Sequence, residues 1–136
     1  MKRWGLCLLR VSTGWLLVIW GLDKIVNVDH GLAVAEGFYL GIGSQAFFLN
    51  VFGGLEALLG GLVVLGLWRR WAYPVMTVTV GVTALAVWKS VIDPWGWVFE
   101  GSNPLFYPSV IILAAALTIW GSMGDDTMTL DARRSA

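Results

Sequence analysis

Charged residues are scarce in this sequence. Asp, Glu, Lys and Arg make up only 13% of the 136 residues, whereas soluble domains carry about 25%. The formal net charge is zero and no long basic run is present, so composition excludes a nucleic-acid partner. Hydrophobic residues account for 57% of the chain. This balance is typical of a membrane protein with little material outside the lipid bilayer.

Cysteine and histidine are nearly absent. Cys7 is the only cysteine, which excludes an intramolecular disulfide, a CxxC redox pair and a cysteine-rich metal site. His30 is the only histidine, so a multi-histidine metal or haem site within this chain is excluded too. We therefore expect no metal and no covalently bound cofactor. Cys7 is interpreted as a small packing residue.

Long apolar stretches, in contrast, fill most of the chain. A spanning helix needs about 20 apolar residues, and backbone polar groups in lipid must be satisfied within the helix. Residues 1–124 are therefore predicted to form an all-α, four-span membrane domain, and residues 125–136 a short polar cytoplasmic tail. The first stretch is interpreted as an uncleaved span. The four stretches are Trp4 to Val26, Ala46 to Leu67, Trp71 to Ile92 and Leu105 to Met123.

The connections between these stretches differ in character. Residues 27–45 are too polar at their start to span, and the part from Gly31 to Leu40 predicts a short helix at the membrane interface, anchored by Phe38 and Tyr39. Residues 68–71 read as a tight basic turn. Residues 93–104 form a loop with two prolines and two tryptophans.

The distribution of basic residues predicts the orientation, because cytoplasmic loops carry an excess of Lys and Arg. One side of the membrane would hold only Lys24 and Lys89, beside several acids. We therefore predict that both termini face the cytoplasm. As localisation we expect the inner membrane of a bacterium, which the chain would cross several times. The opposite, basic side would hold Lys2, Arg3, Arg69, Arg70, Arg133 and Arg134.

Two charged residues fall inside the apolar stretches. Glu56 lies near the centre of the second stretch, and Arg10 lies in the first half of the first stretch. Charges at that depth are costly and need a partner or a role. We predict that Arg10 and Glu56 form an intramembrane pair. It would either pin two helices or line a site for a quinone head group or a proton, or one residue would face a partner subunit.

Small residues surround Glu56. Gly53, Glu56 and Gly60 share one helix face, and Gly61 lies one residue further round. Small residues let a neighbouring backbone approach closely. Gly53, Gly60 and Gly61 are therefore predicted to pack against another helix.

Four polar residues lie near the ends of spans on the predicted outer side. Long charged side chains at span ends reach toward the headgroups, which is one interpretation of them. The other is the rim of an outward-facing polar pocket formed by Asp23, Lys24, His30 and Lys89.

Two segments resemble the DoxX family of membrane proteins. In LLRVSTGWLLVIWGLDKIVN, residues 8–27, an early Arg is followed by Gly-x-x-Lys, here Arg10, Gly21 and Lys24. Residues 38–74 are similar in their Gly-rich entry loop, Glu56, the glycines after it and the basic turn. This family is similar in fold to MauE-type proteins and to small subunits of thiosulfate:quinone oxidoreductases. The resemblance implies a four-helix bundle linked to quinone or sulfur redox chemistry.

Three functions follow as hypotheses. The first is an accessory subunit of a membrane redox complex, near a quinone and without a redox cofactor of its own. The second is a stand-alone bundle that handles a small molecule or a proton. The third is the small subunit of a thiosulfate:quinone oxidoreductase. The lipid bilayer and either other membrane subunits or further copies of this chain are the expected partners.

Overall fold

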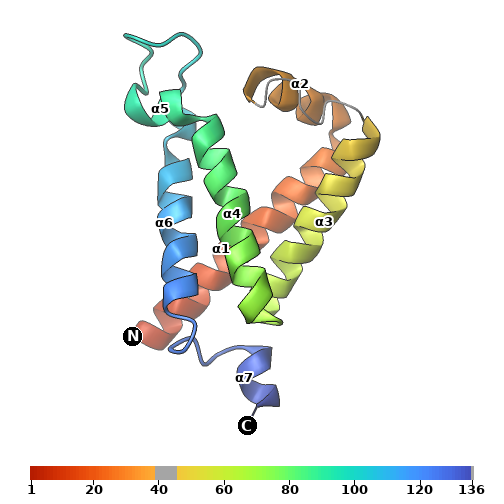
Figure 1. The fold of residues 1–136 in the computed structure, drawn as a ribbon, viewed down its shortest axis with the longest axis vertical. Coiled ribbons are helices and arrows are strands. Elements are labelled where there is room, and N and C mark those ends of the chain that lie inside the picture. Colours follow the sequence, from red (N-terminus) through yellow and green to blue (C-terminus); the bar gives the residue numbers. More distant parts are fainter. Residues whose placement is uncertain (39–45, 136) are drawn as a thin grey trace.

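The described part of the chain is entirely helical. The computed structural model describes residues 1–38 and 46–135 (Figure 1). The helices follow one another along the chain from α1 to α7, and a short 3₁₀ helix, η1, lies between α5 and α6. The bounds are α1 Lys2–Val26, α2 Val28–Phe38, α3 Ala46–Leu65, α4 Arg69–Ala86, α5 Trp88–Ile92, η1 Pro104–Phe106, α6 Pro108–Gly121 and α7 Leu130–Arg134.

Three segments within the described residues are long and apolar enough to cross a membrane, namely Lys2–Val26, Ala46–Leu65 and Pro104–Gly121. They identify a multi-pass membrane protein. The remaining predicted span, Trp71 to Ile92, is divided at Val87 into α4 and α5 and is not one of the three. Two arginines, three threonines and a proline dilute the apolar character of α4.

The short helix expected between the first two spans is present as α2. It begins at Val28, three residues before the predicted start at Gly31, and its last residue is Phe38. Tyr39 and Leu40, which were expected to complete it, lie outside the described residues.

Helices α1 and α3 run antiparallel and touch backbone to backbone. A Cβ atom added to Gly21 would lie 2.5 Å from the Gly53 carbonyl oxygen, and one added to Gly60 would lie 2.5 Å from the Gly14 carbonyl oxygen. Gly14 and Gly21 on α1 are seven residues apart, as are Gly53 and Gly60 on α3. Seven residues are about two helical turns, so in each helix the two glycines lie on one face. Gly53 and Gly60 thus lie at a helix contact. Gly61 does not, because a Cβ there would meet nothing within 4 Å. It faces away from α1.

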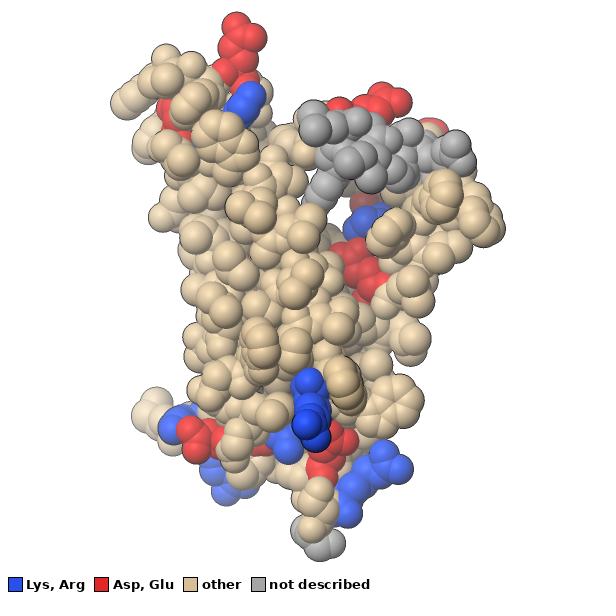
Figure 2. All heavy atoms as spheres, in the orientation of Figure 1, with Lys and Arg blue, Asp and Glu red and all other residues tan. Residues whose placement is uncertain are grey.

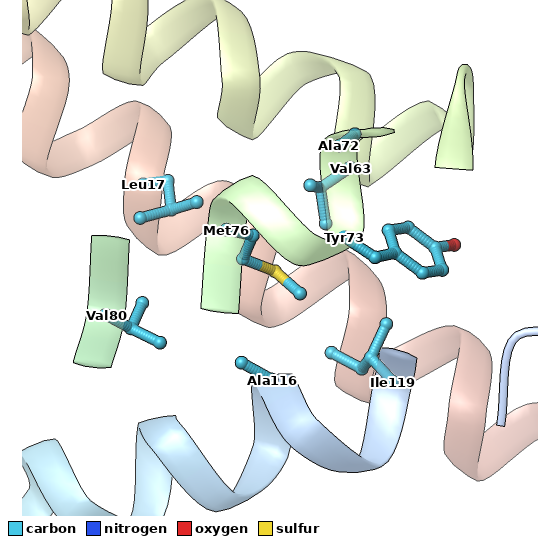
Figure 3. Packing of buried hydrophobic residues seen from close by; sticks show 8 residues of the cluster. All are labelled: Leu17, Val63, Ala72, Tyr73, Met76, Val80, Ala116 and Ile119. Atoms are coloured by element: carbon cyan, nitrogen blue, oxygen red, sulfur yellow. The ribbon is translucent and has the colours of Figure 1, made fainter. Parts of the chain in front are cut away.

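The hydrophobic core draws on all four long helices. Leu17 of α1 and Val63 of α3 meet Met76 of α4 and Ile119 of α6, and each is at most 1% exposed (Figure 3). The bundle is therefore a single packed unit of four helices. The cluster is completed by Ala72, Tyr73, Val80 and Ala116.

The two ends of the bundle differ, and we name them by what they carry. Both chain termini and α7 lie at one end, called the termini end (Figure 1). Helices α2 and α5 and the loop 93–103 lie at the other, called the loop end. On the face shown in Figure 2, charged side chains gather near the two ends, and uncharged side chains cover most of the surface between them.

Candidate functional site

The guanidinium of Arg10 is enclosed at the termini end. Only 2% of its surface is exposed. Its Nε atom lies 2.9 Å from Asp126 Oδ2, Nη1 donates to the carbonyls of Val63 (3.2 Å) and Val64, and Nη2 donates to the carbonyl of Met128 at 2.6 Å. The two valine carbonyls belong to the last turn of α3, where a cation is favoured by the helix dipole. Arg10 therefore joins α1, α3 and the C-terminal segment.

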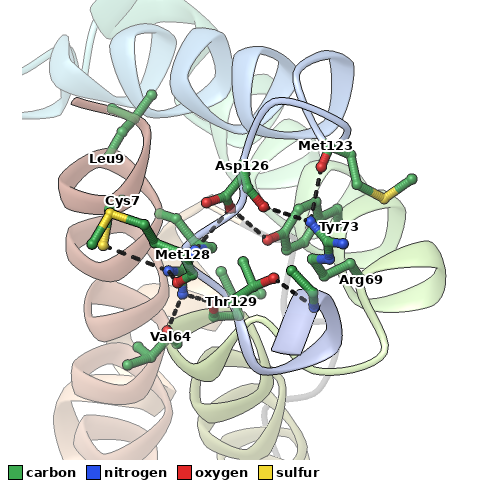
Figure 4. Close-up of polar contacts among 12 residues, drawn as sticks. Cys7, Leu9, Val64, Arg69, Tyr73, Met123, Asp126, Met128 and Thr129 are labelled. Atoms are coloured by element: carbon green, nitrogen blue, oxygen red, sulfur yellow. Dashed lines mark hydrogen bonds and ion pairs between the residues drawn. The ribbon is translucent and has the colours of Figure 1, made fainter. Parts of the chain in front are cut away.

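Asp126 holds the C-terminal segment against the bundle (Figure 4). The Tyr73 hydroxyl donates to Asp126 Oδ2 at 3.0 Å, and Arg69 Nη1 donates to the backbone carbonyls of Asp126 and Met123, both at 2.8 Å. Asp126 Oδ1 is buried and receives no hydrogen bond from the described residues. The Asp126 carboxylate thus contacts α1 through Arg10 and α4 through Tyr73.

The residues after Asp126 fold back onto the turn between α3 and α4. The Asp131 N–H donates to the Gly66 carbonyl at 3.1 Å, and the Arg69 N–H donates to Asp131 Oδ2 at 3.0 Å. Gly66 has a φ of 66°, a conformation that glycine adopts at little cost, and a side chain there would collide with Thr129. The polar C-terminal segment is thus an integral part of the fold, which hydropathy gave no reason to expect.

The predicted pairing of Arg10 with Glu56 is wrong. Arg10 donates to the carbonyl of Val64, which is eight residues beyond Glu56 and so about 12 Å away along α3. Side chains on a helix also lean toward its N-terminus. Because the two helices are antiparallel, Arg10 and Glu56 lean away from each other. Each residue therefore pairs with a different group.

Glu56 pairs with Lys24, near the loop end of α1. Lys24 Nζ lies 2.5 Å from Glu56 Oε2 and 3.4 Å from the Trp20 carbonyl oxygen. Here the lean of the side chains brings the two groups together, since Lys24 leans toward the centre of α1 and Glu56 leans toward the loop end. The Lys24 side chain is 30% exposed and that of Glu56 10%. This pair is the candidate functional site.

The predicted outer rim is only partly assembled. Asp23 and His30 meet at 2.6 Å on the surface, and Lys24 turns inward to Glu56. Lys89 is exposed on α5, and within the described residues no hydrogen bond or ion pair joins it to the other three. Asp23, Lys24 and His30 thus lie at one place and Lys89 at another.

A second ordered feature of the loop end is the turn after α5. The Asp93 carboxylate accepts the backbone N–H groups of Trp97 (3.1 Å), Val98 (2.7 Å) and Phe99 (2.9 Å). These donors, that of Phe99 foremost, hold the pKa of Asp93 below its usual range. The indoles of Trp95 and Trp97 stack with centroids 5.6 Å apart and are 69% and 83% exposed. The sequence indicated an aromatic loop but not its internal order.

No group of three or more His, Cys, Asp or Glu residues suited to a metal ion occurs in residues 1–38 and 46–135. Compared with known proteins, the chain matches the family model described as DoxX over residues 5–89, more than half of its length. Neither a curated protein nor a solved structure matches it. The matched region contains Arg10, Lys24 and Glu56 and ends before Asp126.

Proposed function

The chain belongs to the DoxX family, and from this premise we propose that it is an accessory subunit of a quinone-linked redox complex in the cytoplasmic membrane of a bacterium. In this role it holds no redox centre of its own. It supports a catalytic partner and contributes to the environment of the quinone.

The observation that supports a partner subunit most directly is the ordered aromatic loop at the loop end. Trp95 and Trp97 are stacked and strongly exposed, and the Asp93 carboxylate fixes the backbone that carries them. Rigid aromatic side chains lose little conformational entropy on binding and are enriched in interface hot spots. The neighbouring Ile92 and Leu105 are also exposed, which extends the apolar surface available to a partner.

The proposed topology has four spans, with α4 and α5 together forming the one that hydropathy alone does not identify. Arg69 and Arg70 begin α4 at the termini end, where Lys2 and Arg3 also lie. Lys24 and Lys89 lie toward the loop end. By the positive-inside rule this bias supports a cytoplasmic termini end.

The proposal of a nearby quinone is supported by one pair of residues in the described structure. Lys24 offers an ammonium donor beside Glu56 within a largely apolar helix pair. A bound quinone would accept and release electrons and protons for the complex, and this chain would bind and orient its head group only.

Purification from native membranes tests the proposed role. The tagged chain, extracted in mild detergent, should co-elute with a membrane redox protein in fixed stoichiometry, and the assembly should reduce a quinone. Thiosulfate as the electron donor would identify it as a thiosulfate:quinone oxidoreductase. A variant with Trp95→Ala and Trp97→Ala should insert normally but lose the partner.

The matched control is Trp68→Ala with Trp71→Ala, two tryptophans that are similarly exposed but lie at the termini end, where α4 begins. This variant should keep the partner. A monodisperse monomer obtained after gentle extraction, with no redox protein bound, would overturn the accessory role in favour of a stand-alone bundle.

A further inference from the structure

The ion pair of Lys24 and Glu56 lies deep along α3. Glu56 is the eleventh of the 20 residues from Ala46 to Leu65, so its carboxylate lies near the middle of an apolar helix. An ionised group at that depth costs a few kcal/mol at least. The glycine contacts already hold α1 against α3, so the pair is not required to join the two helices.

The pair is also accessible. The Lys24 side chain keeps 30% of its surface exposed, whereas Arg10 and Asp126 in the other buried pair keep 2% each. Figure 2 shows acidic and basic side chains within a hollow between the α3 side and the α4 side of the molecule. A molecule of modest size can therefore approach the charges.

The pair has unused hydrogen-bonding capacity. An ammonium group has three donors, and Lys24 directs one to Glu56 Oε2 and a weaker one to the Trp20 carbonyl. Among the described residues none donates to Glu56 Oε1. Within residues 1–38 and 46–135, one donor of Lys24 and one acceptor of Glu56 thus have no protein partner.

We infer that Lys24 and Glu56 bind the polar head of a neutral, lipid-soluble molecule that carries a carbonyl or hydroxyl oxygen. A carbonyl oxygen accepts from Lys24, and a hydroxyl can donate to Glu56. The head is neutral because the two charges cancel each other, and a charged ligand would leave a net charge in a poorly solvated site. A long apolar body would remain among the lipid-facing side chains.

Quinones and quinols belong to this chemical class. To the extent that the ligand is a quinone, the inference rests on the proposed function and locates where the quinone of that complex contacts this chain. Both residues of the proposed site belong to this chain. The isolated chain can therefore test the site even if no redox complex is found, and a failure here leaves the co-purification result untouched.

The experiment uses 4-decylbenzophenone, a neutral aromatic ketone that crosslinks to nearby C–H bonds on irradiation. The full chain in lipid nanodiscs is irradiated with this probe, and the adducts are mapped by mass spectrometry. Labelling should concentrate on the peptides around Lys24 and Glu56. Decyl-1,4-benzoquinone should compete about tenfold better than decylbenzene, the ratio that about 1.4 kcal/mol of head-group binding produces.

Two variants distinguish binding of the probe at this site from its general partitioning into lipid. In Lys24→Met with Glu56→Leu both charges are removed together, so no lone charge is left to destabilise the fold, and site labelling should fall about tenfold. The control, Lys2→Met with Asp125→Leu, removes a Lys–Asp pair of similar length (2.6 Å) that is 70% and 56% exposed, and labelling should not change. Equal competition by decylbenzene, or undiminished labelling in the Lys24–Glu56 variant, would overturn the inference.

Discussion

The Arg10–Asp126 and Lys24–Glu56 pairs, which both begin on α1, differ in how completely the fold encloses them. At the termini end the guanidinium of Arg10 meets a carboxylate and three backbone carbonyls, and almost none of it is exposed. Nearer the loop end the ammonium of Lys24 meets one carboxylate oxygen and one distant carbonyl, and it stays partly exposed. The flat, five-donor guanidinium suits the crowded site, whereas the compact ammonium leaves room. The difference indicates that one pair completes the fold and the other remains available to a ligand.

The largest effect should come from breaking the pair at the termini end. Arg10→Met leaves Asp126 buried and unpaired, and loss of one partner of a buried pair costs about 3–5 kcal/mol. The free energy of unfolding, measured by denaturant titration in mixed micelles, should fall by that amount. Arg10→Met combined with Asp126→Leu should lose less, because no isolated charge remains. A single variant as stable as the wild type would show that Arg10 does not complete the fold.

The next effect concerns what holds α1 and α3 together near the loop end. Gly53→Ala places a methyl group 2.5 Å from the Gly21 carbonyl oxygen, and such overpacking costs about 1–3 kcal/mol. Gly54→Ala is the matched control, since its Cβ meets nothing within 4 Å. The same unfolding titration should separate the two variants. Equal stabilities would mean that the ion pair, and not backbone contact, sets the helix spacing.

A smaller effect is expected from the Lys24–Glu56 pair itself. A double-mutant cycle with Lys24→Met and Glu56→Leu should give a coupling energy of at most about 1.7 kcal/mol, the largest value for polar contacts between membrane helices, whose average is about 0.6 kcal/mol. That is well below the expected effect at Arg10, because the Lys24 side chain is still partly exposed. A coupling energy as large as the loss of unfolding free energy in Arg10→Met would show that the two ion pairs stabilise the fold equally.

The smallest effect is local and pH-dependent. The folded loop lowers the pKa of Asp93, so the loop is fully stabilised above the ordinary pKa of about 3.9 and loses this contribution as pH falls through the lowered value. The amide proton resonances of Trp97, Val98 and Phe99, followed by NMR in micelles, should shift below about pH 4. In Asp93→Asn these amide protons should resonate at neutral pH where those of the wild type resonate in acid. Glu100 is an exposed acid of the same loop, and Glu100→Gln should leave the resonances unchanged at neutral pH. Unchanged amide shifts in Asp93→Asn would contradict the role of the carboxylate.

Hydropathy predicted the long helices well, because length and apolar content are local properties of the chain. It predicted the end of α3 less well. The helix stops at Leu65 and not at Leu67, since Gly66 takes a left-handed conformation beneath Thr129. That constraint comes from a residue more than sixty positions away, and no local pattern contains it.

One of the two ion-pair partners could have been predicted from the sequence and the other could not. Lys24 could have been matched to Glu56 from the sequence. Gly14 and Gly21 repeat the seven-residue spacing of Gly53 and Gly60, and this fixes the register of an antiparallel contact.

The partner of Arg10 could not have been found this way. Asp126 lies in a polar segment with no periodicity. Counting residues along each predicted span gives the depth of a charge in the membrane, but it cannot show that the C-terminal segment folds back onto the bundle.

The contact between Arg10 and the C-terminal segment also imposes an order on synthesis. Met128, whose carbonyl accepts from Arg10, follows it by 118 residues. The ribosome therefore delivers the first helix to the membrane long before the groups that neutralise its guanidinium exist. Until then Arg10 must stay near water or lipid phosphate, so α1 can reach its final depth only after the chain has been made as far as Met128. A nascent chain that stalls before Asp126 carries an unmatched charge within its first helix, a feature by which membrane quality control can distinguish it from the finished protein.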